Sequence, residues 1–172
     1  MSSKAPFTIR PAEPGDVTLI HRFILELAEY ERMLDEAVLT VEDVHRALFG
    51  ETPAAEVVLA YEGEEPAGLA LFFHNFSTFL GRRGLYLEDL YVRPAFRGRG
   101  YGKALLVHLA GIARDRGCGR MDWEVLAWNE GPIRFYESLG AVAMNEWRHF
   151  RLTGEALQRV AEQGSVAAGK ED

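Results

Sequence analysis

A strand pattern, a glycine-rich turn and a helix start follow one another between Leu85 and Leu106, and such a succession can bind an anion. The turn reads Arg97-Gly98-Arg99-Gly100-Tyr101-Gly102-Lys103, and the apolar positions after it have helical spacing. Glycines let a ligand approach the backbone closely, and the first N–H groups of a helix have no partner inside the helix. We therefore expect a phosphate-binding turn at residues 97–103.

The spacing of the glycines excludes two familiar phosphate motifs. Gly98, Gly100 and Gly102 alternate, so the turn matches neither the dinucleotide-binding G-x-G-x-x-G pattern nor the P-loop pattern. A tight turn that binds nothing is the alternative interpretation. The arginines at positions 97 and 99 favour the phosphate site.

Two adjacent acids in the preceding strand, Glu88 and Asp89, are candidates for proton transfer. Strand alternation sends adjacent side chains to opposite faces, so both acids can serve one pocket only if the strand splays or bulges. An acid that merely pairs with an arginine is the alternative. Regular alternation gives one face Leu85, Leu87, Asp89 and Tyr91, and the other face Tyr86, Glu88, Leu90 and Val92.

The turn also fits the [Q/R]-x-x-G-x-[G/A] signature of the GNAT superfamily of N-acetyltransferases, and the chain resembles its diamine acetyltransferases, the spermidine/spermine and thialysine enzymes. The similarity runs in order from about Phe7 to about Val160, which is more specific than any single motif. The matching pieces are Ile9-Arg10-Pro11-Ala12, Glu26-Leu27-Ala28-Glu29-Tyr30-Glu31, Tyr86-Leu87-Glu88-Asp89, Trp128-Asn129-Glu130, Phe135-Tyr136 and Leu139-Gly140-Ala141.

The resemblance implies an α/β (α+β) fold, a single GNAT-type domain whose mixed, mostly antiparallel sheet has helices on both faces. We expect this domain to cover residues 1–163 and a disordered tail to cover 164–172, which are small and polar. It also implies a homodimer.

For function, the resemblance implies acetyl-CoA-dependent N-acetylation of a small primary amine, by direct attack in a ternary complex. Glu88 would be the base, acting through water, and Tyr136 the acid that protonates the departing thiolate, because a phenol carries its proton at neutral pH. Acetyl-CoA would contact Leu90, Tyr91, Val92, Arg97, Gly98, Arg99, Gly100, Tyr101, Gly102, Lys103, Asn129 and Tyr136.

The amine pocket implied by the resemblance contains Tyr30, Glu31, Glu88, Asp89 and Trp147. A carboxylate and aromatic rings suit an alkylammonium group. A solvated helix end for Glu31 and core packing for Trp147 are the alternatives. Residues 77–79 read Ser-Thr-Phe, where the spermidine/spermine branch has an acid and a tryptophan, so we expect a lysine-like amine or short diamine rather than a long polyamine.

Two other functional classes remain as alternatives. A non-catalytic acyl-CoA-binding sensor is disfavoured by the presence of Glu88 and Tyr136 beside an intact phosphate turn. Acetylation of protein amino groups is disfavoured by the small-amine resemblance and by the net charge of −7.

Bulk properties narrow the class further. The net charge of −7 argues against nucleic-acid binding and suits a cationic substrate. No apolar stretch approaches the ~20 residues of a membrane helix, and the N-terminus lacks the apolar run of a signal peptide. The single cysteine, Cys118, has no neighbouring histidine in the sequence, and the five histidines lack metal-ligand spacing. We expect a soluble cytoplasmic protein with no metal.

The elements that must position these residues follow from periodicity and turn signals. Because a strand, a helix and another strand succeed one another from position 85 to 126, we expect a right-handed parallel crossover there. We expect strands at 7–11, 57–61, 67–76, 85–92, 121–126 and 147–152, and helices at 16–30, 40–49, 100–116, 129–139 and from 153. Asp16 is expected to cap the first helix, Thr40 and Asp43 to form a capping box at the second, and Gly140 to end the helix that starts at 129.

Overall fold

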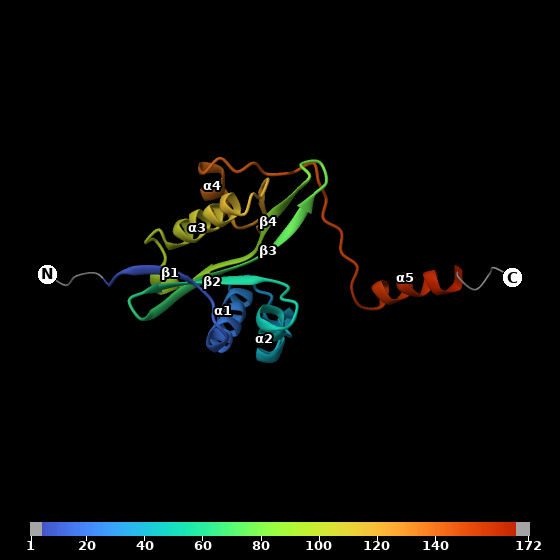
Figure 1. Ribbon diagram of the computed structural model, residues 1–172, viewed down its shortest axis with the longest axis horizontal. Coiled ribbons are helices and arrows are strands. Elements are labelled where there is room, and N and C mark those ends of the chain that lie inside the picture. Colours follow the sequence, from blue (N-terminus) through green and yellow to red (C-terminus); the bar gives the residue numbers. More distant parts are fainter. Residues whose placement is uncertain (1–4, 168–172) are drawn as a thin grey trace. The chain divides into compact units, whose positions relative to one another are not determined.

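The structure is a computed structural model that describes residues 5–167 (Figure 1). By its internal contacts the chain divides into a first unit, up to Glu124, and a second unit, from Val125. The prediction of one domain over 1–163 therefore stays a prediction.

The first unit is built on one five-stranded sheet in the order β1-β2-β3-β4-β5. The first four strands form an antiparallel meander, and β5 is parallel to β4, as the predicted crossover requires. The strands are β1 (Phe7–Pro11), β2 (Glu56–Glu62), β3 (Glu65–Ser77), β4 (Arg82–Val92) and β5 (Met121–Trp123).

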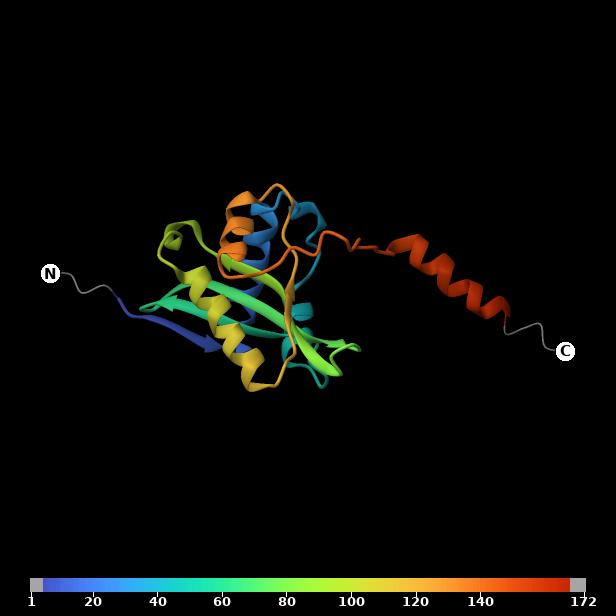
Figure 2. The ribbon, with the colours of Figure 1, turned by 90° about the horizontal axis from the view of Figure 1, so that it is seen from above.

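Helices cover both faces of this sheet, which confirms the predicted fold class (Figures 1 and 2). The first two helices lie on one face and the third crosses the other. They are α1 (Val17–Tyr30), α2 (Val41–Phe49) and α3 (Tyr101–Asp115), with short 3-10 turns at Pro14–Asp16, Leu34–Glu36 and Pro94–Phe96.

The cap of α2 follows the prediction, whereas the cap of α1 differs from it. Thr40 and Asp43 form the predicted capping box, in which each side chain accepts from the other residue's backbone N–H. Asp16 precedes α1 but makes no side-chain cap, because its carboxylate is held by the Arg10 guanidinium through contacts of 2.7 and 2.9 Å. The first strand is thereby tied to the start of α1.

Each face of the sheet buries an apolar layer that fixes the helices. On the α3 face, the helix contributes Leu105 and Leu109, both with no exposed surface. On the other face, the core consists of Val17, Ile20, Phe23, Leu27, Val44, Leu48, Val57, Leu59, Leu69 and Tyr91.

The second unit contains α4 (Glu130–Ser138) and α5 (Gly154–Ala167). Helix α4 ends as predicted, with Gly140 in the left-handed conformation at a φ of +88°. Helix α5 continues to residue 167, and residues 168–172 of the tail predicted to be disordered lie outside the described residues.

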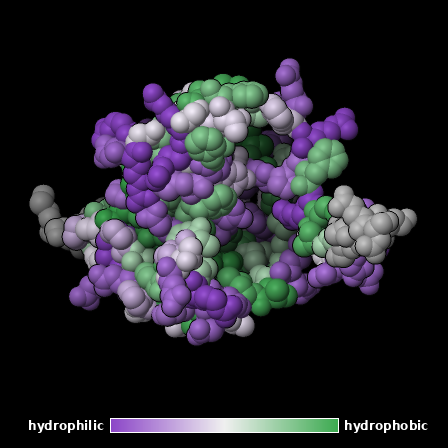
Figure 3. Space-filling model, turned by 45° about the vertical axis from the view of Figure 1, so that its right-hand side comes forward, coloured by the Kyte–Doolittle hydropathy of each residue, from purple (hydrophilic) through white to green (hydrophobic). Residues whose placement is uncertain are grey.

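Two strand predictions differ from the structure. Strand β5 ends at Trp123 rather than at position 126, and residues 147–152 form no strand. An alternating pattern makes a strand only where a neighbouring strand completes its ladder, and no strand within the described part of the second unit does so. Phe150 is 88% exposed. Figure 3 shows in green where apolar residues reach the surface on one face of the molecule.

Candidate active site

The parallel ladder between β4 and β5 is short, and this leaves one edge of β4 open within the first unit. It joins only Leu85–Leu87 to Met121–Trp123, although β4 continues to Val92. The N–H group of Arg93 donates to the carbonyl of Ala67 over 2.9 Å, on the β3 side. Alternation therefore turns the amides at positions 90 and 92 away from β3, as donors beyond the end of the β5 ladder.

A bulge in β4 changes how its two acids face. Leu71 of β3 pairs with Asp89 and the next residue, Phe72, pairs with Leu87, so Glu88 is an extra residue in the ladder. The regular alternation predicted from position 85 to 92 is therefore wrong beyond Leu87. The bulge meets the condition under which both acids can serve one pocket.

Register shows which residues of β4 share a face. Asp89 lies opposite Leu71, and Tyr86 lies opposite Phe73. Because positions 71 and 73 of β3 point the same way, Asp89 and Tyr86 also share that face. This is the face covered by α1, whose Phe23 ring contacts Tyr91 edge-on at 6.1 Å.

Three carboxyl groups influence one another on this face. Asp89 is half-buried, and its burial, followed by the negative charges of Glu88 and Glu31, raises its pKa to about 6. Glu31 follows directly on α1, where its N–H donates to Leu27 over 2.9 Å, and burial raises its pKa too. Glu88 itself is exposed. Acids gathered in this way favour a bound cation.

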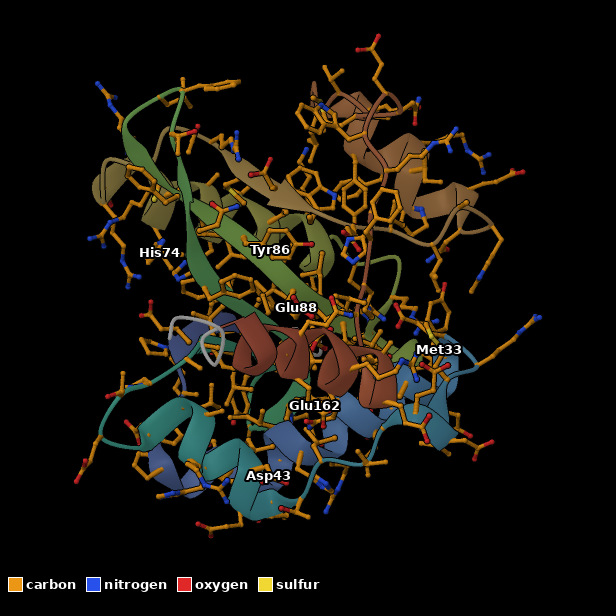
Figure 4. All side chains as sticks on the ribbon, turned by 90° about the vertical axis from the view of Figure 1, so that its right-hand side faces the viewer. Met33, Asp43, His74, Tyr86, Glu88 and Glu162 are labelled. Carbon is orange, nitrogen blue, oxygen red and sulfur yellow. The ribbon has the colours of Figure 1, made fainter. Side chains whose placement is uncertain are left out.

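Tyr86 borders this group and was not among the predicted site residues. Figure 4 shows Tyr86 and Glu88 along β4, with Met33 beyond the end of α1. Burial raises the pKa of Tyr86 to about 12, and the carboxylates of Glu124 and Glu88 add to the shift. In the sequence, Tyr86 stands two positions before Glu88 in the same predicted strand. This spacing could have indicated that Tyr86 lies near the acids.

The glycine-rich turn has the open backbone expected of an anion site. Gly98 and Gly100 have φ values of +73° and +83°, a conformation that favours glycine, and Gly100 directly precedes α3. No side chain caps the helix there, and a Cβ built on either glycine meets nothing within 4 Å. These residues fit a pyrophosphate group, because the start of α3 has no side-chain cap and the two glycines leave the space beside it open.

Side chains of the turn anchor it to the sheet. Arg99 Nη1 lies 2.7 Å from both carboxylate oxygens of Glu62 on β2. The Tyr101 hydroxyl also donates to Glu62, and its ring stacks on Phe7 of β1 at 4.0 Å. Arg99 and Tyr101 thus use their side chains within the protein, and their backbone remains available for a ligand.

Arg97 connects the turn to the end of α1. Its Nε donates to the carbonyl of Val92 over 2.9 Å, and its guanidinium carbon lies 4.8 Å from the centre of the Tyr30 ring. Lys103 is exposed in the first turn of α3. The predicted phosphate turn and the predicted amine-pocket residue Tyr30 are therefore joined by one cation–π contact.

The remaining predicted site residues belong to the second unit. Asn129 precedes α4 without a side-chain cap to it, and Tyr136 is half-buried on α4 with its ring 5.4 Å from that of Phe135. Trp147 is 72% exposed.

Cys118 has a histidine neighbour that the sequence did not reveal. Its Sγ lies 3.8 Å from His74 Nδ1, which is also 3.0 Å from the carbonyl of Gly84, while His74 Nε2 lies 2.9 Å from Arg116 Nη1. Both ring nitrogens are engaged, so the imidazole is poorly placed to activate the thiol.

Among residues 5–167 no cluster of three or more His, Cys, Asp or Glu side chains could hold a metal ion. The same residues contain no helix long and apolar enough to cross a membrane.

Comparison with known proteins agrees with this geometry. The model of the acetyltransferase (GNAT) family matches residues 23–141. Thialysine N-epsilon-acetyltransferase from Bos taurus is 38% identical over 164 residues, covering 89% of this chain and 96% of the relative. L-ornithine N5-acetyltransferase from Arabidopsis thaliana is 32% identical over 197 residues, covering 88% and 86%.

Among solved structures, an integron cassette protein from the mobile metagenome of V. cholerae superposes with a TM-score of 0.76 at 29% identity, covering 91% of this chain and 98% of that one. The fold accords with these matches. The chain therefore belongs to the acetyltransferase (GNAT) family and is an N-acetyltransferase that acts on amines.

Proposed function

We propose that this enzyme transfers the acetyl group of acetyl-CoA to the primary amine of a small cationic substrate, such as a lysine-like amine or a short diamine. The observation that carries the proposal is the group of three acids, Glu31, Glu88 and Asp89, beside the open edge of β4. The names of the relatives, thialysine and ornithine acetyltransferases, specify amines at the ends of amino-acid side chains.

The acids bind and orient the ammonium group in this proposal. Because the pKa of Asp89 is raised to about 6, its carboxyl is mostly ionised at neutral pH, and a bound cation relieves its repulsion with Glu88 and Glu31. Tyr30 and Trp147 supply aromatic faces to the same substrate. Binding of the cation and ionisation of Asp89 thus favour each other.

Ser77 supports a short substrate rather than a long one. Its side chain is buried, and its Oγ accepts from the N–H of Leu80 over 3.3 Å. A hydroxyl engaged in this turn offers no charge to a second, distant ammonium group. This agrees with the thialysine-like pattern of residues 77–79.

Proton transfer falls to two side chains. Glu88, exposed at the bulge, takes a proton from the ammonium through a water molecule, which leaves a nucleophilic amine. The nitrogen–carbon bond then forms as the carbon–sulfur bond of the thioester breaks, and the nitrogen gives up its second proton to water. Tyr136 gives its proton to the departing thiolate and recovers one from water. Direct attack in the ternary complex needs no acylated cysteine.

Acetyl-CoA supplies the activated acetyl group, and the backbone of this chain holds it. The amides of Leu90 and Val92, with Tyr91 between them, donate to the thioester carbonyl and the pantetheine arm. The turn at residues 97–103 binds the pyrophosphate through its amides, Arg97 and Lys103. Asn129 contacts the arm.

Thiol release from acetyl-CoA across a panel of amines tests the function. The panel contains thialysine, lysine, putrescine, spermidine, a lysine peptide and a blank without amine. We expect the highest kcat/KM with thialysine or a short diamine. A clear preference for spermidine would overturn the branch assignment, and preference for the peptide would support protein acetylation. If no amine gives thiol release but calorimetry shows that acetyl-CoA binds, the result would favour a non-catalytic acyl-CoA sensor over an enzyme.

We also propose that the enzyme is a homodimer. Within the second unit, residues 141–153 have no helix or strand but carry exposed apolar side chains, among them Val142, Trp147 and Phe150. Burial of such side chains against another chain is favourable. Light scattering is expected to give twice the chain mass of 19.3 kDa at micromolar concentration, and a monomer there would overturn the proposal.

A further inference from the structure

The first unit has a cavity on the same face of the sheet as the three acids, outside the groups used above. Its volume is about 580 Å³, within the range of roughly 300–1,000 Å³ common for small-molecule sites. The end of α2, the chain leading into β2, and β3 line it. Its lining includes Leu48, Phe49, Ala54, Val57 and Phe73.

The charged groups at this cavity are already paired, which excludes a cationic occupant. Glu56 lines the cavity, but both of its oxygens accept from the Arg116 guanidinium, one of them over 2.8 Å. His74, the other ionisable side chain of the lining, lies 2.9 Å from Arg116. The space therefore suits an uncharged, apolar group.

A continuous ring surface joins the cavity to the acids. Phe73 lines the cavity and stacks on Tyr86 with ring centres 5.0 Å apart, and both rings are half-buried. Tyr86 in turn lies close enough to Glu88 for that carboxylate to shift its pKa. Asp89 lies opposite Leu71, two positions along β3 from Phe73, a separation of about 7 Å.

We infer that this cavity is an apolar subsite for the tail of the acceptor amine. An ammonium group held at Glu31 and Asp89 places an aryl or short alkyl group, attached a few bonds away, across Tyr86 and Phe73 and into the cavity. The enzyme thus accepts arylalkylamines as well as lysine-like amines and short diamines. This inference rests on the proposed amine acetylation, and the reaction at the nitrogen is the same.

The test compares 2-phenylethylamine with 1,3-diaminopropane as acceptors. Wild-type enzyme is expected to acetylate both. Ala54→Phe places a ring into the cavity from an exposed position, and we expect it to lower the kcat/KM ratio of phenylethylamine to diaminopropane at least tenfold. Ala110→Phe, on the exposed side of α3, is the matched control and should leave the ratio within twofold.

The outcomes separate this subsite from the proposed function. Turnover of diaminopropane without turnover of phenylethylamine would overturn the subsite and leave the function standing. An equal fall with both amines in Ala54→Phe would also overturn it. No turnover with either amine would remove the proposed function itself. If thermal denaturation shows that Ala54→Phe does not fold, Ala54→Leu fills the cavity with a smaller group and is expected to change the ratio in the same direction.

Discussion

Tyr136→Phe is expected to lower kcat about 100-fold or more while the KM for the amine stays near the wild-type value. A positioned general acid contributes about 10²–10⁴ to a rate, and phenylalanine removes only the hydroxyl that gives the proton. The aromatic contact with Phe135, at 5.4 Å, is retained, so α4 keeps its packing. Steady-state kinetics on wild-type and variant enzyme, with thiol release as the signal, measure the effect.

Tyr61→Phe is the matched control for this substitution. It removes a phenolic hydroxyl from β2 that accepts from Arg10 over 3.0 Å and has no role in the proposed chemistry. We expect its kcat to remain within about twofold of wild type, since the hydrogen bond it loses contributes about 1 kcal/mol to stability alone. Unchanged turnover in Tyr136→Phe would show that another group protonates the thiolate.

Asp89→Asn is expected to stabilise the fold at pH 7 and to raise the KM for the amine at least tenfold. The pKa of Asp89 in the folded protein is about 6, above the ordinary value of 3.8, because burial and two neighbouring acids disfavour its charge. Each pKa unit corresponds to about 1.4 kcal/mol, so the ionised group costs on the order of 1–3 kcal/mol. Asparagine keeps the shape without the charge, but it binds an ammonium group less strongly.

The stability of the fold depends on pH through Asp89, because its pKa differs between the folded and unfolded states. Between about pH 4 and 6 the folded protein binds more protons at Asp89 than the unfolded chain does, so this group lowers stability as pH rises through that window. In urea denaturation from pH 4 to 8, the free energy of unfolding of wild type should fall relative to that of Asp89→Asn as the pH rises. The wild-type KM for the amine should rise below about pH 6, where Asp89 becomes protonated.

Glu88→Gln separates the two acids. Glu88 is exposed at the bulge, so we expect its replacement to lower kcat with a much smaller gain in stability. If wild type and Asp89→Asn have equal free energies of unfolding across the pH range, the ionised Asp89 does not destabilise the fold, and its proposed effect on stability is wrong.

Much of the fold was readable from local sequence because its signals are local. The Thr40–Asp43 capping box requires a spacing of three residues, and Gly140 stops a helix through its own φ. The strand, turn and helix around Gly100 are likewise encoded within one short segment. Each of these features appears in the structure where the sequence predicts it.

The features that the sequence did not predict depend on partners far along the chain. The bulge at Glu88 exists only in relation to the register with Leu71 and Phe72. The anchoring of Arg99 depends on Glu62, 37 positions earlier. The strand predicted at 147–152 fails because alternation describes a side-chain pattern and supplies no neighbour. The roles proposed for Glu88 and Tyr136 rest on family resemblance, because the chemistry of a carboxylate or a phenol alone permits several roles.

The bulge also has an evolutionary consequence. Leu71–Asp89 and Phe72–Leu87 are the pairs that an uninterrupted ladder would contain if Glu88 were absent. Loss of its single codon would therefore leave every other side chain of β4 on its present face, together with the phosphate turn and the buried acid. The proposed base would disappear and the scaffold would persist. A relative that lacks the Glu88 codon would therefore keep the proposed binding groups of this strand and lose only the proposed base.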